Sequence, residues 1–367
     1  MKFEHAQRMF FSWRGQSDDV AHRPSELTTR MKATTRLASL LVIVLGCVFQ
    51  PAAAQPTIVI KFSHVVAPDA PKGKAAEFFA RRTAELSKGA VKVEVYPNST
   101  LYKDKEEMEA LQLGAVQMLA PSVAKLAPLG LKEFEVFDLP YIFDNTEMLH
   151  KVTQGELGAS LLAKLEPKGI KGLAFWDNGL KSFSANKPLK TPADFRGLKM
   201  RIQSSKVLEA QFRALGALPQ VMGFSDVYQA LQTGVIDGTE NPHSNFYTQR
   251  MFEVQKHITL TEHGYLGYVV ITNKRFWDSL PSGIRGQIEQ AMRETTVYAN
   301  KIAQEENDNA LAKIRESGKT QVYSPTPEER AEFKKAMIGT HREMASRIGK
   351  ETIDAIYRET GFHPDKL

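Results

Sequence analysis

Two stretches of the chain carry side chains suited to holding an anion. In the first, Gly197 is expected to form a turn that leads into a short strand, Leu198 to Ile202. Side chains alternate between the two faces of a strand, so Met200 should lie on one face and Arg201 on the other. An arginine fixed on a strand presents a rigid fork of N–H donors that matches the two oxygens of a carboxylate. The first stretch therefore predicts a carboxylate-binding site at Arg201.

The second stretch should hold an amide group at a bend. Residues 225–233 are expected to form an amphipathic helix, followed by Gly234, a short apolar strand and an Asp-Gly turn that ends at Asn241 and Pro242. Proline disfavours the helical conformation for the residue before it. The side chain of Asn241 is therefore expected to face a ligand from this bend.

Together these stretches, Arg196 to Ser205 and Ala230 to Pro242, resemble the signature of the solute-binding receptors of TRAP transporters, the tripartite ATP-independent periplasmic uptake systems. The resemblance extends from about Thr57 to Arg358, nearly the whole mature chain. It implies that Arg201 binds the carboxylate of the substrate and that Asn241 contacts the ligand.

The class of ligand is indicated by the segment from Trp176 to Pro188, which includes Lys181. Many TRAP receptors for sugar acids carry an arginine where this chain has Lys181, and the lysine variant resembles the C4-dicarboxylate branch, which binds succinate, malate or fumarate. A lysine is a compact point charge, and together with Arg201 it could neutralise a dianion. A solvated Lys181 is the alternative, as is a monocarboxylate, such as a keto or aromatic acid, bound through Arg201 alone. Further candidates from this segment, or from the resemblance, are Trp176, Asn178 and the aromatic Phe224.

The elements that must position these residues begin with alternating strands and helices. We expect strands at 58–62, 91–96 and 117–120, with helices at 73–87 and 106–113. This order requires a parallel sheet with right-handed crossovers, in which ligands lie beyond the carboxyl ends of the strands. His64 follows the first strand and Ser122 the third, so both are candidate ligand contacts, although His64 could instead be structural. Tyr268, on an apolar strand at 265–272, is a weaker candidate.

The predicted fold is an α/β, two-lobed periplasmic solute-binding architecture. A mature chain of 313 residues exceeds what one hydrophobic core organises. We expect lobe I to comprise 55–178 and 267–306, and lobe II to comprise 179–266 and 307–367. The pattern at 281–317 is helical, and about 30 residues of helix span about 45 Å. The resemblance implies that this long helix crosses both lobes.

Residues 1–54 are expected to be removed from the mature protein. Met31 to Arg36 is basic, Leu37 to Phe49 is apolar, and Ala52 to Ala54 supplies the small residues read by a signal peptidase. Thirteen apolar residues are too few for an ordinary membrane span. We expect translation to start at Met31 and cleavage to follow Ala54, which predicts a periplasmic protein. Lipid anchoring at Cys47 is the alternative.

Composition excludes several classes of function. The chain has 48 Lys and Arg and 42 Asp and Glu, of which residues 1–54 contain seven and four, so the mature formal net charge is +3. This near-neutral balance, with no basic block, argues against a nucleic-acid partner. The single cysteine, Cys47, precedes the expected cleavage point, which excludes disulfides and thiolate zinc sites from the mature chain. No metal and no cofactor is expected.

The predicted function is ligand capture by hinge closure and delivery to TRAP membrane subunits, by a receptor expected to be a monomer. The alternative from a different functional class is a periplasmic enzyme that acts on carboxylates, with His64 or His263 as general base. The segment Gly223 to Val227 is not a nucleophile elbow, because its last position is not glycine. We therefore expect no enzymatic activity.

Overall fold

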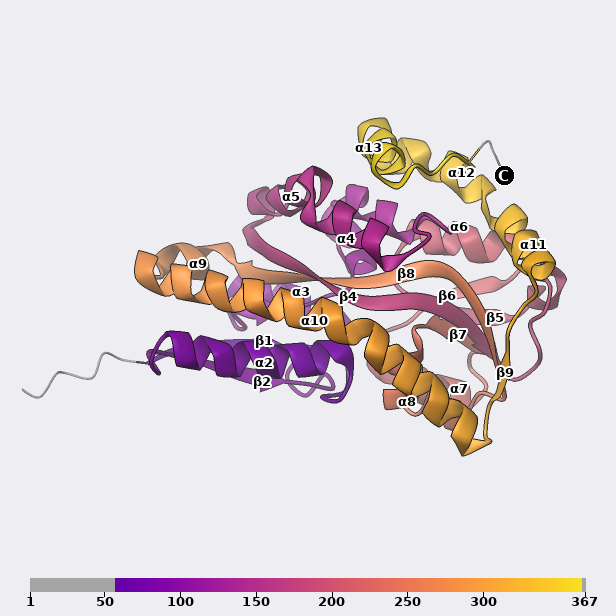
Figure 1. Ribbon diagram of the computed structural model, residues 1–367, viewed down its shortest axis with the longest axis horizontal. Helices are drawn as coiled ribbons and strands as arrows, with labels where there is room; N and C mark the ends of the chain where they lie inside the picture. The colour runs from indigo at the N-terminus through magenta and orange to yellow at the C-terminus, as the bar shows by residue number, and fades with distance from the viewer. Residues whose placement is uncertain (1–56, 365–367) are drawn as a thin grey trace, which may run out of the picture. The chain divides into compact units, whose positions relative to one another are not determined.

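The structure of this chain is a computed structural model that describes residues 57–364 (Figure 1). The expected start at Met31, the cleavage after Ala54 and the alternative lipid anchor at Cys47 lie outside the described residues. The centre of the fold is a mixed nine-stranded sheet in the order β2-β1-β3-β8-β4-β7-β5-β6, with β9 pairing with β8. The strands are β1 (Ile58–Ser63), β2 (Val91–Tyr96), β3 (Met118–Leu119), β4 (Ile170–Ala185), β5 (Lys199–Ile202), β6 (Leu218–Val221), β7 (Gly238–Asn241), β8 (His257–Asn273) and β9 (Gln321–Tyr323).

Helices cover the sheet and connect its strands (Figure 1). The α-helices are α2 (Pro71–Leu86), α3 (Asp104–Leu113), α4 (Thr146–Gln154), α5 (Glu156–Ala163), α6 (Lys206–Ala214), α7 (Val227–Gln232), α8 (His243–Thr248), α9 (Lys274–Ser279), α10 (Ser282–Ser317), α11 (Pro327–Met337), α12 (Gly339–Ile348) and α13 (Lys350–Thr360). Short 3-10 helices lie at η1 (Val123–Lys125), η2 (Ala127–Leu129), η3 (Lys132–Asp138), η4 (Glu166–Lys168), η5 (Pro192–Phe195), η6 (Phe224–Asp226) and η7 (Met251–Glu253).

The predicted parallel arrangement is confirmed at both ends of the sheet. β1 pairs in parallel with β2 and with β3, as their crossover connections require. At the other end β5 pairs in parallel with β6 and β7. Each end has its own apolar core: Phe62 and Phe79 belong to one, and Met200 and Phe212 to another.

Two long antiparallel strands, β4 and β8, join the two ends of the sheet. β4 continues past Gly179 to Ala185, and its second half pairs with β7. Its register shifts between Asp177 and Gly179. Gly179 has φ 134°, and a Cβ there would lie 2.6 Å from the side-chain nitrogen of Asn307. Only glycine fits this backbone conformation and close approach, and it lies next to the predicted lobe crossing at 178.

The predicted long helix is confirmed as α10, which has 36 residues. It packs against α2 and β4 in its first part and against α8 further along, as Figure 1 shows. Ile288 and Met292 belong to the core of the β1 end, whereas Ile314 belongs to a core shared with α7 and α8. The helix ends at Gly318, which adopts the left-handed conformation typical of a helix C-cap.

Helices α4 and α5 are separated at Gly155, which takes an extended conformation. One sequence-based boundary was wrong. The Asp-Gly turn expected before Pro242 is instead strand β7, because Gly238 to Asn241 pair with β4.

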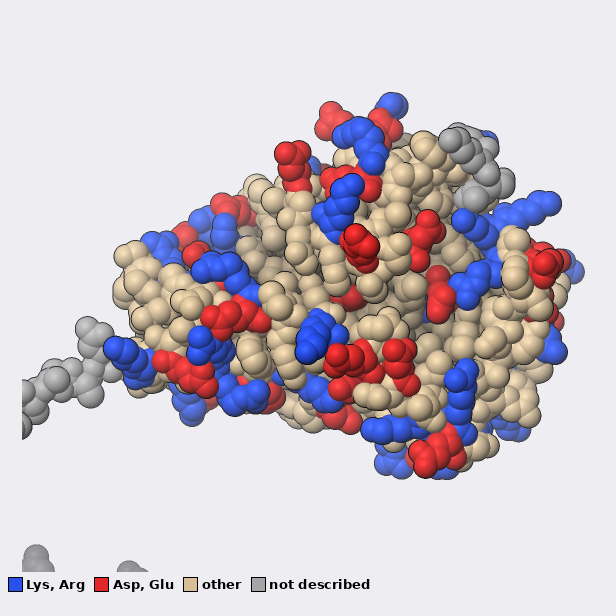
Figure 2. All heavy atoms as spheres, viewed as in Figure 1, with Lys and Arg blue, Asp and Glu red and all other residues tan. Residues whose placement is uncertain are grey.

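The molecular surface carries both signs of charge, and Figure 2 shows Lys and Arg interspersed with Asp and Glu on the visible face. No helix among residues 57–364 is both long and apolar enough to cross a membrane.

Candidate ligand-binding site

Arg201 lies on β5 with its guanidinium buried, and only 1% of the residue is exposed. Its Nε and Nη2 donate to the carbonyl oxygen of Met222 at 3.0 and 2.9 Å, which fixes the plane of the group. A guanidinium has five N–H donors, so three remain. No carboxylate in the described part of the chain forms an ion pair with Arg201. Burial lowers the pKa of Arg201 to about 10, which leaves the group charged at neutral pH.

Phe224 and Asn241 lie on the same side of the sheet as this guanidinium. The Arg201 guanidinium carbon is 5.6 Å from the ring centroid of Phe224. Thr239 pairs with Arg201 across β5 and β7, and Asn241 follows two residues later, on the face that Thr239 shares. The amide of Asn241 donates to the Thr239 hydroxyl at 3.3 Å and to the sulfur of Met251 at 3.6 Å. The structure therefore brings these three predicted residues together.

His64 and Ser122 follow β1 and β3, at the carboxyl ends of the strands where ligands were expected. Within residues 57–364 neither ring nitrogen of His64 nor the hydroxyl of Ser122 has a hydrogen-bond partner, although all are buried. Burial, assisted by the positive charge of Lys72, lowers the pKa of His64 to about 3. The imidazole is thus neutral, with one N–H donor and one acceptor for a ligand.

Tyr268 lies between Ser122 and Lys72, a lysine that sequence reasoning missed. Its backbone forms a β-bridge with Ser122, and its hydroxyl accepts a hydrogen bond from Asn245 at 3.2 Å. The ammonium of Lys72 lies 3.9 Å from the centre of the Tyr268 ring and donates to the carbonyl oxygen of Ala120 at 2.9 Å. Burial lowers the pKa of Lys72 to about 7, although Glu107 opposes the shift.

Lys181 was expected to supply the second positive charge of the site, and its position corrects this expectation. Its ammonium lies 2.7 Å from an oxygen of Glu240, and the other oxygen of Glu240 lies 2.7 Å from Nε2 of His263. Glu240 precedes Asn241 on β7, so it points to the face of the sheet opposite Arg201. Burial would raise the pKa of Glu240, but Lys181 and His263 outweigh burial and lower it to about 2. Lys181 therefore belongs to a buried Lys–Glu–His chain, and the negative charge of Glu240 opposes the lowering of the Arg201 pKa by burial.

Trp176 and Asn178 differ in what they can still bind. The indole N–H of Trp176 donates to Thr296 of α10 at 3.2 Å, and its ring packs against Phe62, so this residue is part of a core. The side-chain amide of Asn178 is buried, and neither of its polar atoms has a partner in the described chain. Its backbone oxygen accepts a hydrogen bond from Asn307. Asn178 can still contact a ligand, whereas the polar atom of Trp176 is already engaged.

The second residue that sequence reasoning missed is Lys125, at the end of η1. Its ammonium pairs with Asp104, and both side chains are about nine-tenths buried. The backbone N–H of Phe224 donates to the other oxygen of Asp104. Lys103, beside Asp104, forms an ion pair with Asp226 at 3.1 Å. These contacts join the start of α3 to the segment that carries Phe224. The signal that could have found Lys125 and Lys72 was their place after β3 and β1.

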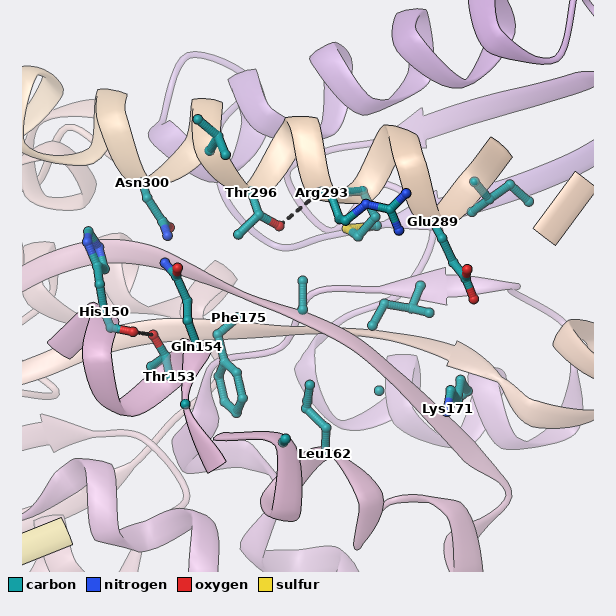
Figure 3. A pocket seen from close by; sticks show the side chains of 18 of the residues that line it. His150, Thr153, Gln154, Leu162, Lys171, Phe175, Glu289, Arg293, Thr296 and Asn300 are labelled. Carbon is teal, nitrogen blue, oxygen red and sulfur yellow. Dashed lines mark hydrogen bonds between the residues drawn. The ribbon is translucent and has the colours of Figure 1, made fainter. Parts of the chain in front are cut away.

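A separate pocket of about 920 Å³ lies between α10 and the pair α4 and α5, over the first half of β4 (Figure 3). Figure 3 shows Arg293, Thr296 and Asn300 on one side of it and Phe175 and Leu162 on the other. None of the nine predicted ligand-binding residues lines it. The unpartnered polar atoms of His64, Ser122 and Asn178 therefore lie outside this pocket.

Comparison with known proteins gives consistent matches. Residues 62–348 match the model of the family described as bacterial extracellular solute-binding protein, family 7. The chain is 66% identical over 310 residues to the C4-dicarboxylate-binding periplasmic protein DctP of Rhodobacter capsulatus, covering 84% of this chain and 93% of that protein.

Two solved structures are similar as well. A TRAP periplasmic solute-binding protein from Sulfurospirillum deleyianum with bound succinate is 47% identical with a TM-score of 0.79, covering 82% of this chain and 98% of that one. A TRAP periplasmic solute-binding protein from Pseudomonas aeruginosa with bound L-malate is 42% identical with a TM-score of 0.76, covering 78% and 99%. These similarities confirm the predicted two-lobed fold.

Proposed function

Because this chain belongs to family 7 of the bacterial extracellular solute-binding proteins, we propose that it captures a C4-dicarboxylate and delivers it to the membrane subunits of a TRAP transporter. The observation that carries this proposal is the buried guanidinium of Arg201, which is held by Met222 and forms no ion pair with a carboxylate of residues 57–364. A buried charge without a partner is costly unless a ligand supplies one. A carboxylate that receives two parallel N–H bonds from Arg201 meets this need.

The remaining contacts support a small anion held between two groups of residues. Phe224 and Asn241 lie beside Arg201, and His64 and Ser122 offer unpartnered polar atoms from the other end of the sheet. The lobe boundaries proposed are 55–178 with 267–306, and 179–266 with 307–367. With these boundaries the two groups come from different lobes, so a bound anion favours the closed arrangement of the lobes.

A C4-dicarboxylate is supported as the ligand by two similar receptors, whose structures contain bound succinate and bound L-malate. One observation favours the alternative, a monocarboxylate bound through Arg201 alone: Lys181 is already paired with Glu240. In either case the proposed role is binding and release without chemical conversion. We further propose that residues 31–54 act as a signal peptide that directs a monomeric receptor to the periplasm.

Isothermal titration calorimetry on the mature chain tests the ligand class. Succinate, malate and fumarate should bind, while pyruvate, benzoate and galactonate should bind at least about a hundredfold more weakly if the site discriminates by about 3 kcal/mol. Tighter binding of a monocarboxylate than of every C4 diacid would move the assignment to the alternative. NMR spectra of the same acids after incubation should show no product, and conversion of any of them would establish an enzyme instead.

A further inference from the structure

Near the proposed site, two buried cations of the described residues form no ion pair with a carboxylate. They are Arg201 and Lys72. The other two lysines that could supply a positive charge to the ligand are already paired with carboxylates. Lys125 pairs with Asp104, and Lys181 pairs with Glu240. The unpaired positive charges of the site therefore belong to one residue on β5 and one on α2.

The surroundings of Lys72 are those of an anion site. The residue is 2% exposed, and its ammonium has three N–H donors, of which one reaches the oxygen of Ala120. Ala120 is two residues before Ser122, whose hydroxyl lacks a partner in the described chain, and the ring below the ammonium is that of Tyr268. His64 is close enough for Lys72 to lower its pKa. Ammonium, hydroxyl and imidazole thus share one buried neighbourhood.

We propose that Lys72 binds the second carboxylate of the ligand, with Ser122 and His64 as its hydrogen-bonding neighbours, so that Lys72 and Arg201 select dianions over monoanions. This inference rests on the proposed function and gives Lys72 the role that the sequence suggested for Lys181. Lys72 lies on α2, in proposed lobe I, and Arg201 lies on β5, in proposed lobe II. Burial lowers the pKa of Lys125, which is close enough to both for each of their positive charges to lower it further. A dianion therefore bridges the two proposed lobes, whereas a monoanion holds only one of them.

The test compares succinate with succinamate, in which an amide replaces one carboxylate at nearly the same size. Wild-type mature protein should prefer succinate. In Lys72→Met, which keeps the length and removes the charge, succinate affinity should fall by about thirtyfold or more, the effect of losing a buried charged partner. Succinamate affinity should change by less than about threefold, because its amide never used the charge. Lys72→Arg should retain the preference for succinate.

Lys74→Met is the matched control. Lys74 lies in the first turns of the same helix, but it is partly exposed and pairs with Glu306 at 2.7 Å. This variant should bind both ligands as wild type does. Thermal unfolding of each variant checks that it is folded, and Lys72→Gln replaces Lys72→Met if the latter is not.

The outcomes separate the two proposals. An equal loss of succinate and succinamate binding in Lys72→Met would mean that Lys72 only supports Tyr268 and Ala120, and it would overturn this inference. Unchanged binding of both ligands would overturn it as well. In both cases wild-type binding of succinate would leave the proposed function intact. Failure of the wild-type protein to bind either acid would instead contradict the proposed function, and this inference with it.

Discussion

Replacing Arg201 with alanine should weaken succinate binding without unfolding the protein. Two of the five N–H groups of Arg201 bond to Met222, which leaves three for the ligand, enough for a bidentate pair with one carboxylate. Two hydrogen bonds to a charged group contribute about 3–6 kcal/mol together. Water that enters the truncated site offsets part of this loss. We expect a loss of about 3–5 kcal/mol, which is an increase in Kd of about 150- to 5,000-fold.

The effect on the free energy of unfolding should be small by comparison. Alanine leaves the carbonyl oxygen of Met222 without its donor, which costs about 1–3 kcal/mol. It also removes a buried cation that has no carboxylate partner in the described chain, and this change is favourable. Denaturant titration should therefore show a folded Arg201→Ala protein whose unfolding midpoint is close to that of the wild type.

Calorimetry with succinate is the assay, and Arg213→Ala is the control. Arg213 is a half-exposed arginine on α6 that pairs with Glu209 and Glu343, and its removal should leave binding unchanged. If Arg201→Ala binds succinate within about threefold of wild type while remaining folded, the account of the site is wrong.

Three further predictions concern the buried charges. Glu240→Gln should destabilise the protein by about 3–5 kcal/mol in denaturant titration, because Lys181 would remain buried without its anion. An unchanged unfolding midpoint would show that the Lys181–Glu240 ion pair does not stabilise the fold. Stability should fall as the pH drops from about 6.5 toward 3, because the pKa of His64 is lowered to about 3 in the fold and the unfolded chain binds the proton first. A His64→Asn variant should lose less stability over this pH range. An identical dependence of stability on pH in the variant and the wild type would refute the assignment. Succinate binding near pH 8 should take up protons. Burial lowers the pKa of Lys72 to about 7 and raises that of Glu107 to about 8, and a bound anion favours the protonated ammonium of Lys72. Calorimetry in buffers of different ionisation enthalpy measures this proton uptake, which should be absent in Lys72→Met.

Arg201 could be predicted because a short strand has an unambiguous alternation. β5 has four residues, and Met200 and Ile202 enter the apolar core while Arg201 faces Phe224. The alternation was enough to place Arg201 on the face opposite Met200, where it is buried in the fold beside Phe224. The long helix α10 was equally predictable, since no proline interrupts it and Gly318 ends it.

Lys181 could not be placed from the sequence because β4 does not keep one alternation throughout. Its register shifts between Asp177 and Gly179 and again between Lys181 and Phe183, so residue spacing no longer tells which face a side chain occupies. The partner that fixes Lys181, Glu240, comes from a strand about sixty residues later. Such a contact depends on the pairing of β4 with β7.

Lys72 was overlooked because the helix was expected to begin only at residue 73. Pro71 is instead the first residue of α2, which places Lys72 in the first turn of a helix against Ala120. Lys72 follows β1, at the edge of the sheet where ligands are expected in parallel arrangements. The sequence therefore pointed to this edge of the sheet but not to Lys72.

A crystal structure of the mature protein with bound succinate tests the central claim most directly. We predict one carboxylate within about 3 Å of two N–H groups of Arg201, with Met222 still accepting from the same guanidinium. A succinate bound elsewhere, for example in the pocket between α10 and α5, with Arg201 making no contact to it, would contradict the account.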